Sequence, residues 1–131
     1  STRPWQHIFD LLNGYLILSK KTYGNNKLNG SWNFGPTDSH VTVKEVISRL
    51  IEIMRIKKKF FIEYDKKIKE TGLLSLNTNK SKKFLKWRPK LSITETLKIT
   101  AEWYLCYIKE KKNIEILSKK QVTNFFHDFK I

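Results

Sequence analysis

The sequence predicts an α/β chain that is rich in helices and has only a few short strands. Serine or threonine followed three positions later by glutamate or glutamine marks helix starts, because the two residues cap each other's backbone N–H groups. Such capping boxes occur at Thr42-x-x-Glu45, Ser92-x-x-Glu95 and Ser118-x-x-Gln121. Short runs of aromatic and β-branched residues between the helical stretches are typical of strands. These runs are 32–35, 60–64 and 73–76.

The first helix is expected to begin near Ile8 and to run to Tyr23. Apolar side chains recur there at the i, i+3, i+4, i+7 spacing that gives a helix one apolar face. This face carries Ile8, Leu11, Leu12, Tyr15, Leu16 and Ser19. Lys20 and Lys21 suit the negative end of the helix dipole, and Gly24 follows as a residue that can close a helix in the left-handed conformation.

Three longer helices and one short helix are expected downstream. The first two capping boxes open helices that end near Arg55 and Ile108. Asn77 or Thr78 caps a short helix that ends before Pro89, because the residue preceding proline disfavours the helical conformation. The third box opens the last helix. Its apolar face is Val122, Phe125, Phe126 and Phe129.

Composition favours a single folded domain in a reducing cytoplasm. The 131 residues are 40% hydrophobic, which is enough for a core, and no linker is long enough to divide them. Cys106 is the lone cysteine, so no intrachain disulfide can form. No apolar run has the length of a membrane span, and no signal-peptide pattern occurs. We therefore expect a cytoplasmic chain with no membrane partner.

The formal charge of +14 has two interpretations. One is an anionic partner such as nucleic acid, because clustered cations attract phosphates. The other is a solvated, lysine-rich surface. The only arginines are Arg3, Arg49, Arg55 and Arg88, and lysines are spread along the chain beside many asparagines and isoleucines. This distribution favours a general compositional bias, so we do not expect nucleic acid as a partner.

Familiar catalytic and cofactor motifs do not occur in the sequence. It has no G-x-G-x-x-G turn, no P-loop and no G-x-S-x-G. His7, His40 and His127 are too scattered to suggest a zinc site. Tyr23 and Lys27 have the Tyr-x-x-x-Lys spacing of a dehydrogenase pair, but glycine and two asparagines lie between them and should end the helix. We therefore expect no catalytic residue, cofactor site or metal site in this chain.

The residues before the first helix form the best candidate site. Arg3 offers a planar fork of donors that matches a phosphate or a carboxylate. Trp5, Gln6 and His7 add stacking and hydrogen-bonding groups within a few residues. The alternative is an ordinary surface arginine near a chain end, and the residues by themselves leave both interpretations open.

At these residues the sequence resembles CDP-glucose 4,6-dehydratases, which are extended short-chain dehydrogenases/reductases. The family segments Arg-Pro-Trp-Gln-His-Val, Trp-Asn-Phe-Gly-Pro, His-Glu-Ala-x-x-Leu-x-Leu-Asp and Leu-Gly-Trp-x-Pro have counterparts here in the same order. The counterparts are residues 3–8 with Leu12-x-Gly14-Tyr15-Leu16, residues 32–36, residues 69–77, and residues 85–89 followed by Leu91, Glu95, Thr100, Trp103 and Tyr104. Order and spacing hold from residue 3 to about residue 108.

The resemblance covers only the C-terminal part of that family. It implies that residues 1–131 are one C-terminal, substrate-binding portion of an extended Rossmann-type dehydrogenase. Residues 1–36 would pack on a Rossmann sheet that this chain lacks, and residues 37–131 would form a small α+β lobe. The dinucleotide-binding half, with the NAD site and the catalytic Tyr-x-x-x-Lys of the parent enzyme, would then precede residue 1.

The resemblance also implies contacts with a sugar nucleotide such as CDP-glucose. The implied substrate-binding residues are Arg3, Trp5, Gln6, His7, Asn33, Gly35 and Glu70. Arg3 would contact the pyrophosphate or nucleotide, and the three residues around His7 would shape that edge. Asn33 and Gly35 would lie at a strand end facing the cleft, with Glu70 near the sugar.

In such enzymes NAD oxidises the sugar at C4, water leaves across C5–C6, and hydride returns at C6. The product, CDP-4-keto-6-deoxyglucose, supplies deoxysugars for surface polysaccharides. The resemblance thus implies a chain that binds substrate but is inactive without its Rossmann half. A homo-oligomer is a further partner compatible with the resemblance. Two alternatives stay open: a basic nucleic-acid-binding module, and an orphaned fragment that retains only an oligomer contact.

Four positions depart from the family pattern. Lys69 replaces histidine, Asn77 replaces aspartate, and Asn79 replaces serine. Lys86 replaces a glycine, which matters if the backbone there has a positive φ.

Overall fold

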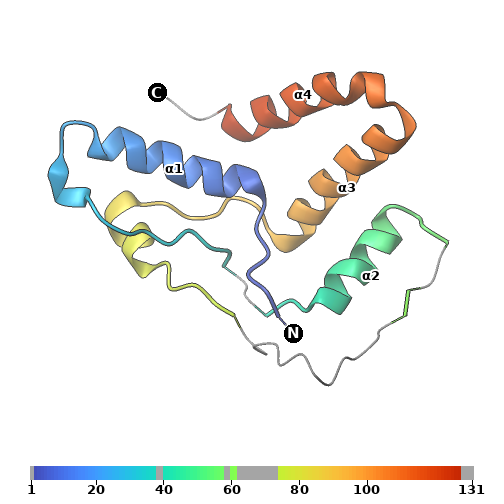
Figure 1. Cartoon of the computed structure of the whole chain (residues 1–131), viewed down its shortest axis with the longest axis horizontal. Coiled ribbons are helices and arrows are strands. Elements are labelled where there is room, and N and C mark those ends of the chain that lie inside the picture. The colour runs from blue at the N-terminus through green and yellow to red at the C-terminus, as the bar shows by residue number, and fades with distance from the viewer. Residues whose placement is uncertain (1, 38–39, 58–59, 62–73, 128–131) are drawn as a thin grey trace.

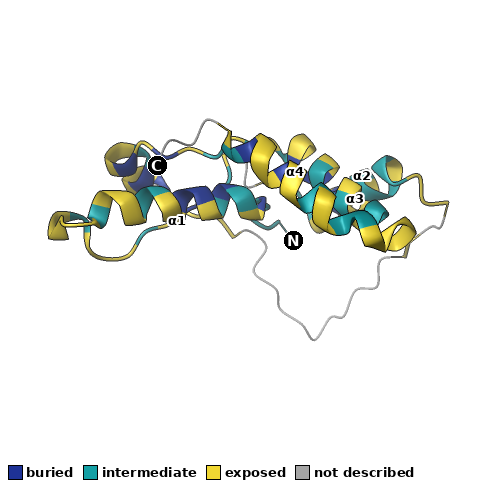
Figure 2. Ribbon diagram, turned by 90° about the horizontal axis from the view of Figure 1, so that it is seen from above, coloured by how far each residue is buried: buried dark blue, intermediate teal, exposed yellow. Residues whose placement is uncertain are grey.

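The computed structural model describes residues 2–37, 40–57, 60–61 and 74–127 as a helical chain (Figure 1). Its helices are α1 (Ile8–Thr22), α2 (Val43–Ile53), α3 (Ile93–Lys109) and α4 (Ile114–Phe126). Short helical turns accompany them: η1 (Asn26–Leu28), η2 (Ser81–Leu85) and η3 (Lys111–Asn113). α3 and α4 form a hairpin, α2 packs against α3, and α1 packs against η1 and η2. Seen from above, α1 lies at one end of the molecule and α2, α3 and α4 at the other (Figure 2).

The predicted starts of α2 and α3 and the predicted end of α1 are confirmed. Thr42 Oγ1 accepts from the backbone N–H of Glu45 at 3.1 Å, and the N–H of Thr42 donates to the Glu45 carboxylate at 2.8 Å. Ser92 and Glu95 make the same reciprocal pair at the start of α3. Gly24 follows α1 with a φ of +69°, so the expected left-handed residue closes that helix.

The third predicted capping box is wrong. α4 begins at Ile114, so Ser118 and Gln121 lie inside the helix. Ser118 Oγ donates to the carbonyl of Ile114 at 2.7 Å and accepts from Trp103 Nε1 at 3.0 Å. Gln121 Nε2 donates to a carbonyl of α3 at 3.2 Å. Ser118 and Gln121 therefore bond to α3 and do not cap a helix start. Phe129, predicted for the same helix face, lies outside the described residues.

The strand predicted at residues 32–35 is also wrong, since these residues have no regular secondary structure. Their polar groups bond instead to η2 and to the segment before it. Ser81 Oγ donates to the carbonyl of Asn33, and Asn33 Nδ2 donates to the carbonyl of Asn77 at 3.3 Å. Lys80 Nζ donates to the carbonyl of Ser31 at 2.9 Å. A strand needs a neighbour to satisfy its backbone groups, and here side chains take that role.

The other two predicted strands lie largely outside the described residues. Residues 60–61 and 74–76 are described and have no regular structure. The backbone pairing within the described ranges is one isolated antiparallel bridge, between Thr2 and Thr42. The described helices of residues 37–131 are α2, η2, α3, η3 and α4, and the α+β lobe predicted for this range stays a prediction.

An aromatic core holds α1, η2 and the segment after η1 together. Phe34, Leu85 and Trp87 are its buried members. The rings of Phe34 and Trp87 lie 5.0 Å apart and nearly perpendicular. Trp87 Nε1 donates to the backbone carbonyl of Asp10 at 3.2 Å, so the core also fixes the start of α1. Partly buried side chains complete the cluster: Leu11, Ile17, Leu18, Leu28 and Trp32.

α1 buries polar residues and exposes much of its apolar face. Its buried residues are Asp10, Asn13 and Gly14. The exposed residues of the predicted apolar face are Ile8, Leu12, Tyr15 and Leu16, named the α1 face below (Figure 2). Ile8 is 54% exposed and Tyr15 is 51% exposed, so α1 presents an apolar surface to solvent in this chain. None of the described helices is both long and apolar enough to cross a membrane.

Lys86 has the backbone conformation that glycine adopts most easily. Its φ is 57° and its ψ is 23°, at the point where η2 ends. A residue with a side chain pays about 1–2 kcal/mol for this left-handed conformation. The lysine that replaces the family's glycine is therefore strained.

Replacing that lysine by glycine (Lys86→Gly) is expected to raise the free energy of unfolding by about 0.5–1 kcal/mol, because relief of strain exceeds the entropy cost of glycine. Lys83→Gly, within the helical turn η2, is the matched control and should lower stability, since glycine is disfavoured in helical backbone. Urea unfolding of the three chains measures both effects. Equal losses at the two positions would contradict the assignment of strain to Lys86.

Candidate functional site

The segment that leads into α1 is fixed by bonds to the residues before α2. Trp5 Nε1 donates to the carbonyl of Val41 at 3.0 Å. The backbone N–H of Trp5 donates to the carbonyl of Arg3 at 2.9 Å, which makes a tight turn. With the bridge between Thr2 and Thr42, these bonds set the path of the chain toward His7. Arg3, Trp5, Gln6 and His7 therefore lie on a segment that is held in place by the residues before α2.

Arg3 is half-buried at the beginning of this segment. Its Nη1 donates to the carbonyl of Thr2 at 3.0 Å. A guanidinium can pair with two phosphate oxygens at once. The contact of Arg3 with a phosphate stays a prediction.

His7 is the N-cap of α1, and this role fixes its tautomer. The backbone N–H of Phe9 donates to His7 Nδ1 at 3.2 Å. An N–H group can only donate, so Nδ1 carries no proton and the neutral ring holds its proton on Nε2. Burial lowers the pKa of His7 despite the nearby carboxylate of Asp10, which favours this neutral form. His7 therefore presents an N–H donor on the side of its ring that faces away from α1.

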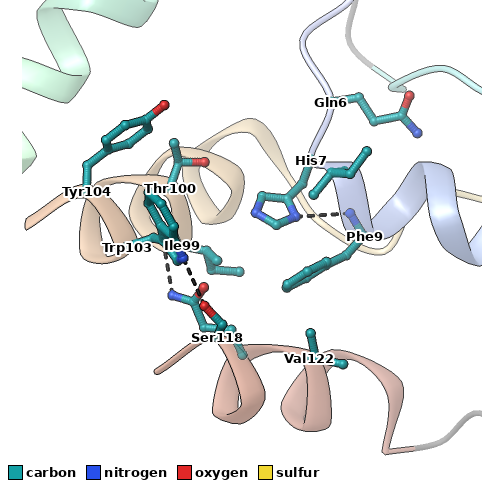
Figure 3. A pocket seen from close by; sticks show the side chains of 11 residues that line it. Gln6, His7, Phe9, Ile99, Thr100, Trp103, Tyr104, Ser118 and Val122 are labelled. Carbon is teal, nitrogen blue, oxygen red and sulfur yellow. Dashed lines mark hydrogen bonds between the residues drawn. The ribbon is translucent and has the colours of Figure 1, made fainter. Parts of the chain in front are cut away.

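That donor faces a cavity of about 380 Å³ between the start of α1, α3 and α4, named the aromatic cavity below. Figure 3 shows the second ring nitrogen of His7 pointing toward Ile99, Thr100 and Trp103 of α3, while Val122 approaches from α4. The lining residues include aromatic, aliphatic and neutral polar side chains, without a lysine, arginine, aspartate or glutamate. They are Gln6, His7, Ile8, Phe9, Ile99, Thr100, Trp103, Tyr104, Ser118, Gln121 and Val122.

A second, smaller hollow of about 190 Å³ lies on the other side of the same segment, and we name it the Gln6 hollow. Gln6 Nε2 is buried and has no hydrogen-bond partner in the structure. A buried donor without a partner is costly, so an acceptor from a ligand or from another chain would be favourable there. The hollow is lined by Trp5, Gln6, Asp10, Pro36, Thr37 and residues 89–93.

The structure brings together only part of the predicted site. Trp5, Gln6 and His7 line the two cavities, whereas Arg3, Asn33 and Gly35 line neither. Asn33 is exposed and uses its amide on a backbone carbonyl of the segment before η2. Gly35 is buried, and a Cβ there would meet Leu76 Cβ at 3.1 Å. Glu70 lies outside the described residues.

The α3 and α4 residues of the aromatic cavity were not among the predicted site residues. Trp103 is named above only as part of the family pattern, and Ser118 and Gln121 are predicted as a helix cap. Their distance from His7 in the sequence leaves no local pattern that links them to it. Only the packing of α4 against α3 brings them to the start of α1.

The architecture defines a helical chain in which segments that resemble one family meet around the start of α1. No protein-family model matches the chain. Among curated proteins, it is similar to the CDP-glucose 4,6-dehydratase of Salmonella typhimurium strain LT2, with 28% identity over 127 residues. The match covers 95% of this chain and 35% of that enzyme, so the chain spans about a third of its relative's length. The resemblance noted in the sequence is confirmed by this comparison.

Proposed function

We propose that this chain is the sugar-nucleotide-binding portion of an enzyme similar to CDP-glucose 4,6-dehydratase. The similarity over 95% of the chain supports this origin. The main observation in support of the proposal is that three of the matched segments meet at the Gln6 hollow. Trp5 and Gln6 come from the first segment, Pro36 from the second, and Pro89 from the fourth. Matching segments scattered over the surface would give no such meeting point.

In this proposal Arg3 binds the diphosphate of the substrate, because its planar fork pairs with two phosphate oxygens. The unpartnered Gln6 Nε2 would donate to a substrate oxygen or to a group of the complementary half. Asn33, Gly35 and Glu70 remain proposed contacts on the sugar side. The substrate class is a nucleoside diphosphate sugar like CDP-glucose.

NAD does not fit the described residues of this chain. A dinucleotide site needs a glycine-rich turn between a strand and a helix. The described helices instead begin at side-chain caps or at the turn η3, and no described strand precedes them. We assign NAD to the nucleotide-binding half of the parent enzyme, and no redox step to this chain.

The α1 face is the proposed contact with that complementary Rossmann half. Four large apolar side chains on one helix face are exposed, while α1 buries Asp10 and Asn13 on its other side. Such a face lowers its free energy when an apolar partner covers it. The same face could also make a contact between two copies of the chain. If the Rossmann half covers the α1 face, a complete substrate site needs this chain and that half together.

A second candidate function is binding of nucleic acid, and one observation favours it. Residues 11–37 and 74–94 contain no aspartate or glutamate, and the turns η1 and η2 within them pack against α1. The cations of these segments are Lys20, Lys21, Lys27, Lys80, Lys82, Lys83, Lys86, Arg88 and Lys90. Lys80 Nζ lies 4.2 Å from the ring centre of Trp32, so cations and aromatic rings do interleave there.

Calorimetric titration of CDP-glucose into the chain tests the first candidate. Arg3→Ala is expected to weaken binding about 10- to 100-fold, since it removes a charge-assisted contact. Arg88→Ala, at an exposed arginine outside both cavities, is the matched control and should leave the affinity unchanged. Binding that ignores Arg3, or NAD binding to this chain alone, would contradict the proposal. Oligonucleotide binding with a steep salt dependence, and no response to CDP-glucose, would favour the second candidate.

A further inference from the structure

We propose that the aromatic cavity binds the heteroaromatic base of the nucleotide, with His7 Nε2–H donating to an acceptor on the ring of the base. This inference rests on the proposed function and adds the position and the recognition of the base.

The size and the walls of the cavity suit a flat ring. A volume of about 380 Å³ is within the range of small-molecule sites, which are mostly apolar with a few placed polar groups. Phe9, Trp103 and Tyr104 supply aromatic surface from α1 and α3. Bases stack on such surfaces because every base has a π-face.

Trp103 is held in place before any ligand arrives. One face of its indole is stacked on Tyr107, with ring centres 5.4 Å apart and planes 6° from parallel. Its Nε1 donates to Ser118 Oγ at 3.0 Å. Phe9 is fixed in turn by Phe125, with ring centres 5.4 Å apart. Rigid walls reduce the entropy that a ligand loses when it binds.

The polar groups of the cavity select a neutral ligand with an acceptor. Thr100 Oγ1 donates to a backbone carbonyl of its own helix at 2.8 Å, and Ser118 Oγ does the same at 2.7 Å. Gln121 Nε2 donates both to Ile99 and to the Glu102 carboxylate. His7 Nε2–H is a donor that faces the cavity (Figure 3), and Gln6 and Tyr104 are further polar residues of its lining.

Among the described residues, the lining contains no side chain that is charged while His7 is neutral, so a phosphate is a poor fit for the cavity. A base with a ring carbonyl or ring nitrogen is a good fit. The ring acceptor pairs with the His7 donor, and the faces of the ring meet the aromatic walls.

The position of Arg3 agrees with this placement. Arg3 precedes His7 by four residues, and a fully extended segment of that length spans at most about 14 Å. The tight turn between Arg3 and Trp5 shortens it further. A nucleotide separates its base from its phosphates by one ribose. One ligand can therefore reach the cavity with its base and Arg3 with its diphosphate.

The test uses the whole chain with cytidine, CDP-glucose and glucose 1-phosphate, the last of which lacks a base. Val122→Trp fills the cavity from α4, and Asn124→Trp places the same bulk on an exposed position of α4 outside it. Calorimetry is expected to show at least tenfold weaker binding of cytidine and CDP-glucose to Val122→Trp. Asn124→Trp should bind like the unmodified chain. Arg3→Ala should weaken CDP-glucose but not cytidine.

Two outcomes separate this inference from the proposed function. CDP-glucose binding that depends on Arg3 but ignores Val122→Trp would place the base elsewhere and leave the proposed function intact. No binding of any of the three compounds would overturn both. Intermolecular nuclear Overhauser effects between cytosine ring protons and Trp103 are expected in the bound unmodified chain. Their absence in a saturated complex overturns the inference even if Val122→Trp does not fold.

His7→Asn adds a test of the donor. Asparagine is a good helix N-cap, so α1 keeps its cap while the ring N–H is lost. Cytidine binding is expected to fall while the thermal midpoint changes little. Unchanged cytidine affinity in this variant would overturn the assigned role of His7.

Discussion

Replacing Asp10 by alanine is expected to lower the free energy of unfolding by about 3 kcal/mol. Asp10 is only 1% exposed. Its carboxylate accepts from the backbone N–H groups of Lys90 at 2.7 Å and of Leu91 at 3.3 Å. Alanine would leave both donors without this acceptor and would untie α1 from the segment that leads into α3. Urea unfolding followed by circular dichroism measures the loss.

Asp10→Asn separates the hydrogen bonds from the charge. Burial raises the pKa of the Asp10 carboxyl above its ordinary value of 3.8, although the backbone donors of Lys90 and Leu91 act in the opposite direction. The folded chain thus holds the Asp10 proton more tightly than the unfolded chain. The contribution of Asp10 to stability is therefore greatest below pH 3.8 and falls as pH rises through the folded pKa.

Asparagine does not titrate, so the stability deficit of Asp10→Asn should narrow as pH rises from below 4 to neutral. Glu45 and Glu95 titrate alike in both chains and cancel in the comparison. His7 does not cancel, because its pKa depends on the Asp10 carboxylate, so both chains also carry His7→Asn. A deficit that widens with pH would contradict the raised pKa.

Replacing Gly14 by alanine is expected to lower the free energy of unfolding by about 2 kcal/mol, although alanine normally favours a helix. A Cβ at Gly14 would lie 2.5 Å from Phe34 Cδ1 and 2.7 Å from Phe34 Cε1. Phe34 cannot easily move away, because its ring also contacts Tyr15 and Trp87. The substitution therefore overpacks the centre of the core.

A smaller side chain at position 34 should rescue the Gly14→Ala variant. Phe34→Leu in the Gly14→Ala background is expected to recover part of the lost stability, so the two substitutions should not be additive. Ser19→Ala, at an exposed position of α1, is the matched control and should be neutral or slightly stabilising. Additive losses in the cycle of Gly14 and Phe34 would show that their contact is not the cause.

Helix starts could be predicted where the capping bonds are local. Thr42 and Ser92 bond within three residues, so the pattern alone identifies the starts of α2 and α3. Ser118 has the same pattern, but Trp103 of α3 takes its hydroxyl as an acceptor. A strand at residues 32–35 could not be decided locally, because strand structure depends on a neighbour.

The candidate site is likewise only partly predictable from the sequence. Trp5, Gln6 and His7 are adjacent in the sequence, so their cluster and its similarity to a family segment are visible without a structure. Trp103 and Val122 reach the same cavity only because α3 and α4 fold back on the start of α1. No spacing rule connects residues so far apart.

The sequence by itself determined the helix-rich class, the limits of α1, the starts of α2 and α3, and the resemblance to a dehydratase. These follow from bonds within a few residues and from ordered segments. Only the tertiary structure decided that α1 buries Asp10 and Gly14 and exposes its apolar face, and that His7 faces a cavity. Burial and cavities depend on which distant side chains occupy the neighbouring space, and that information is not local to any stretch of the chain.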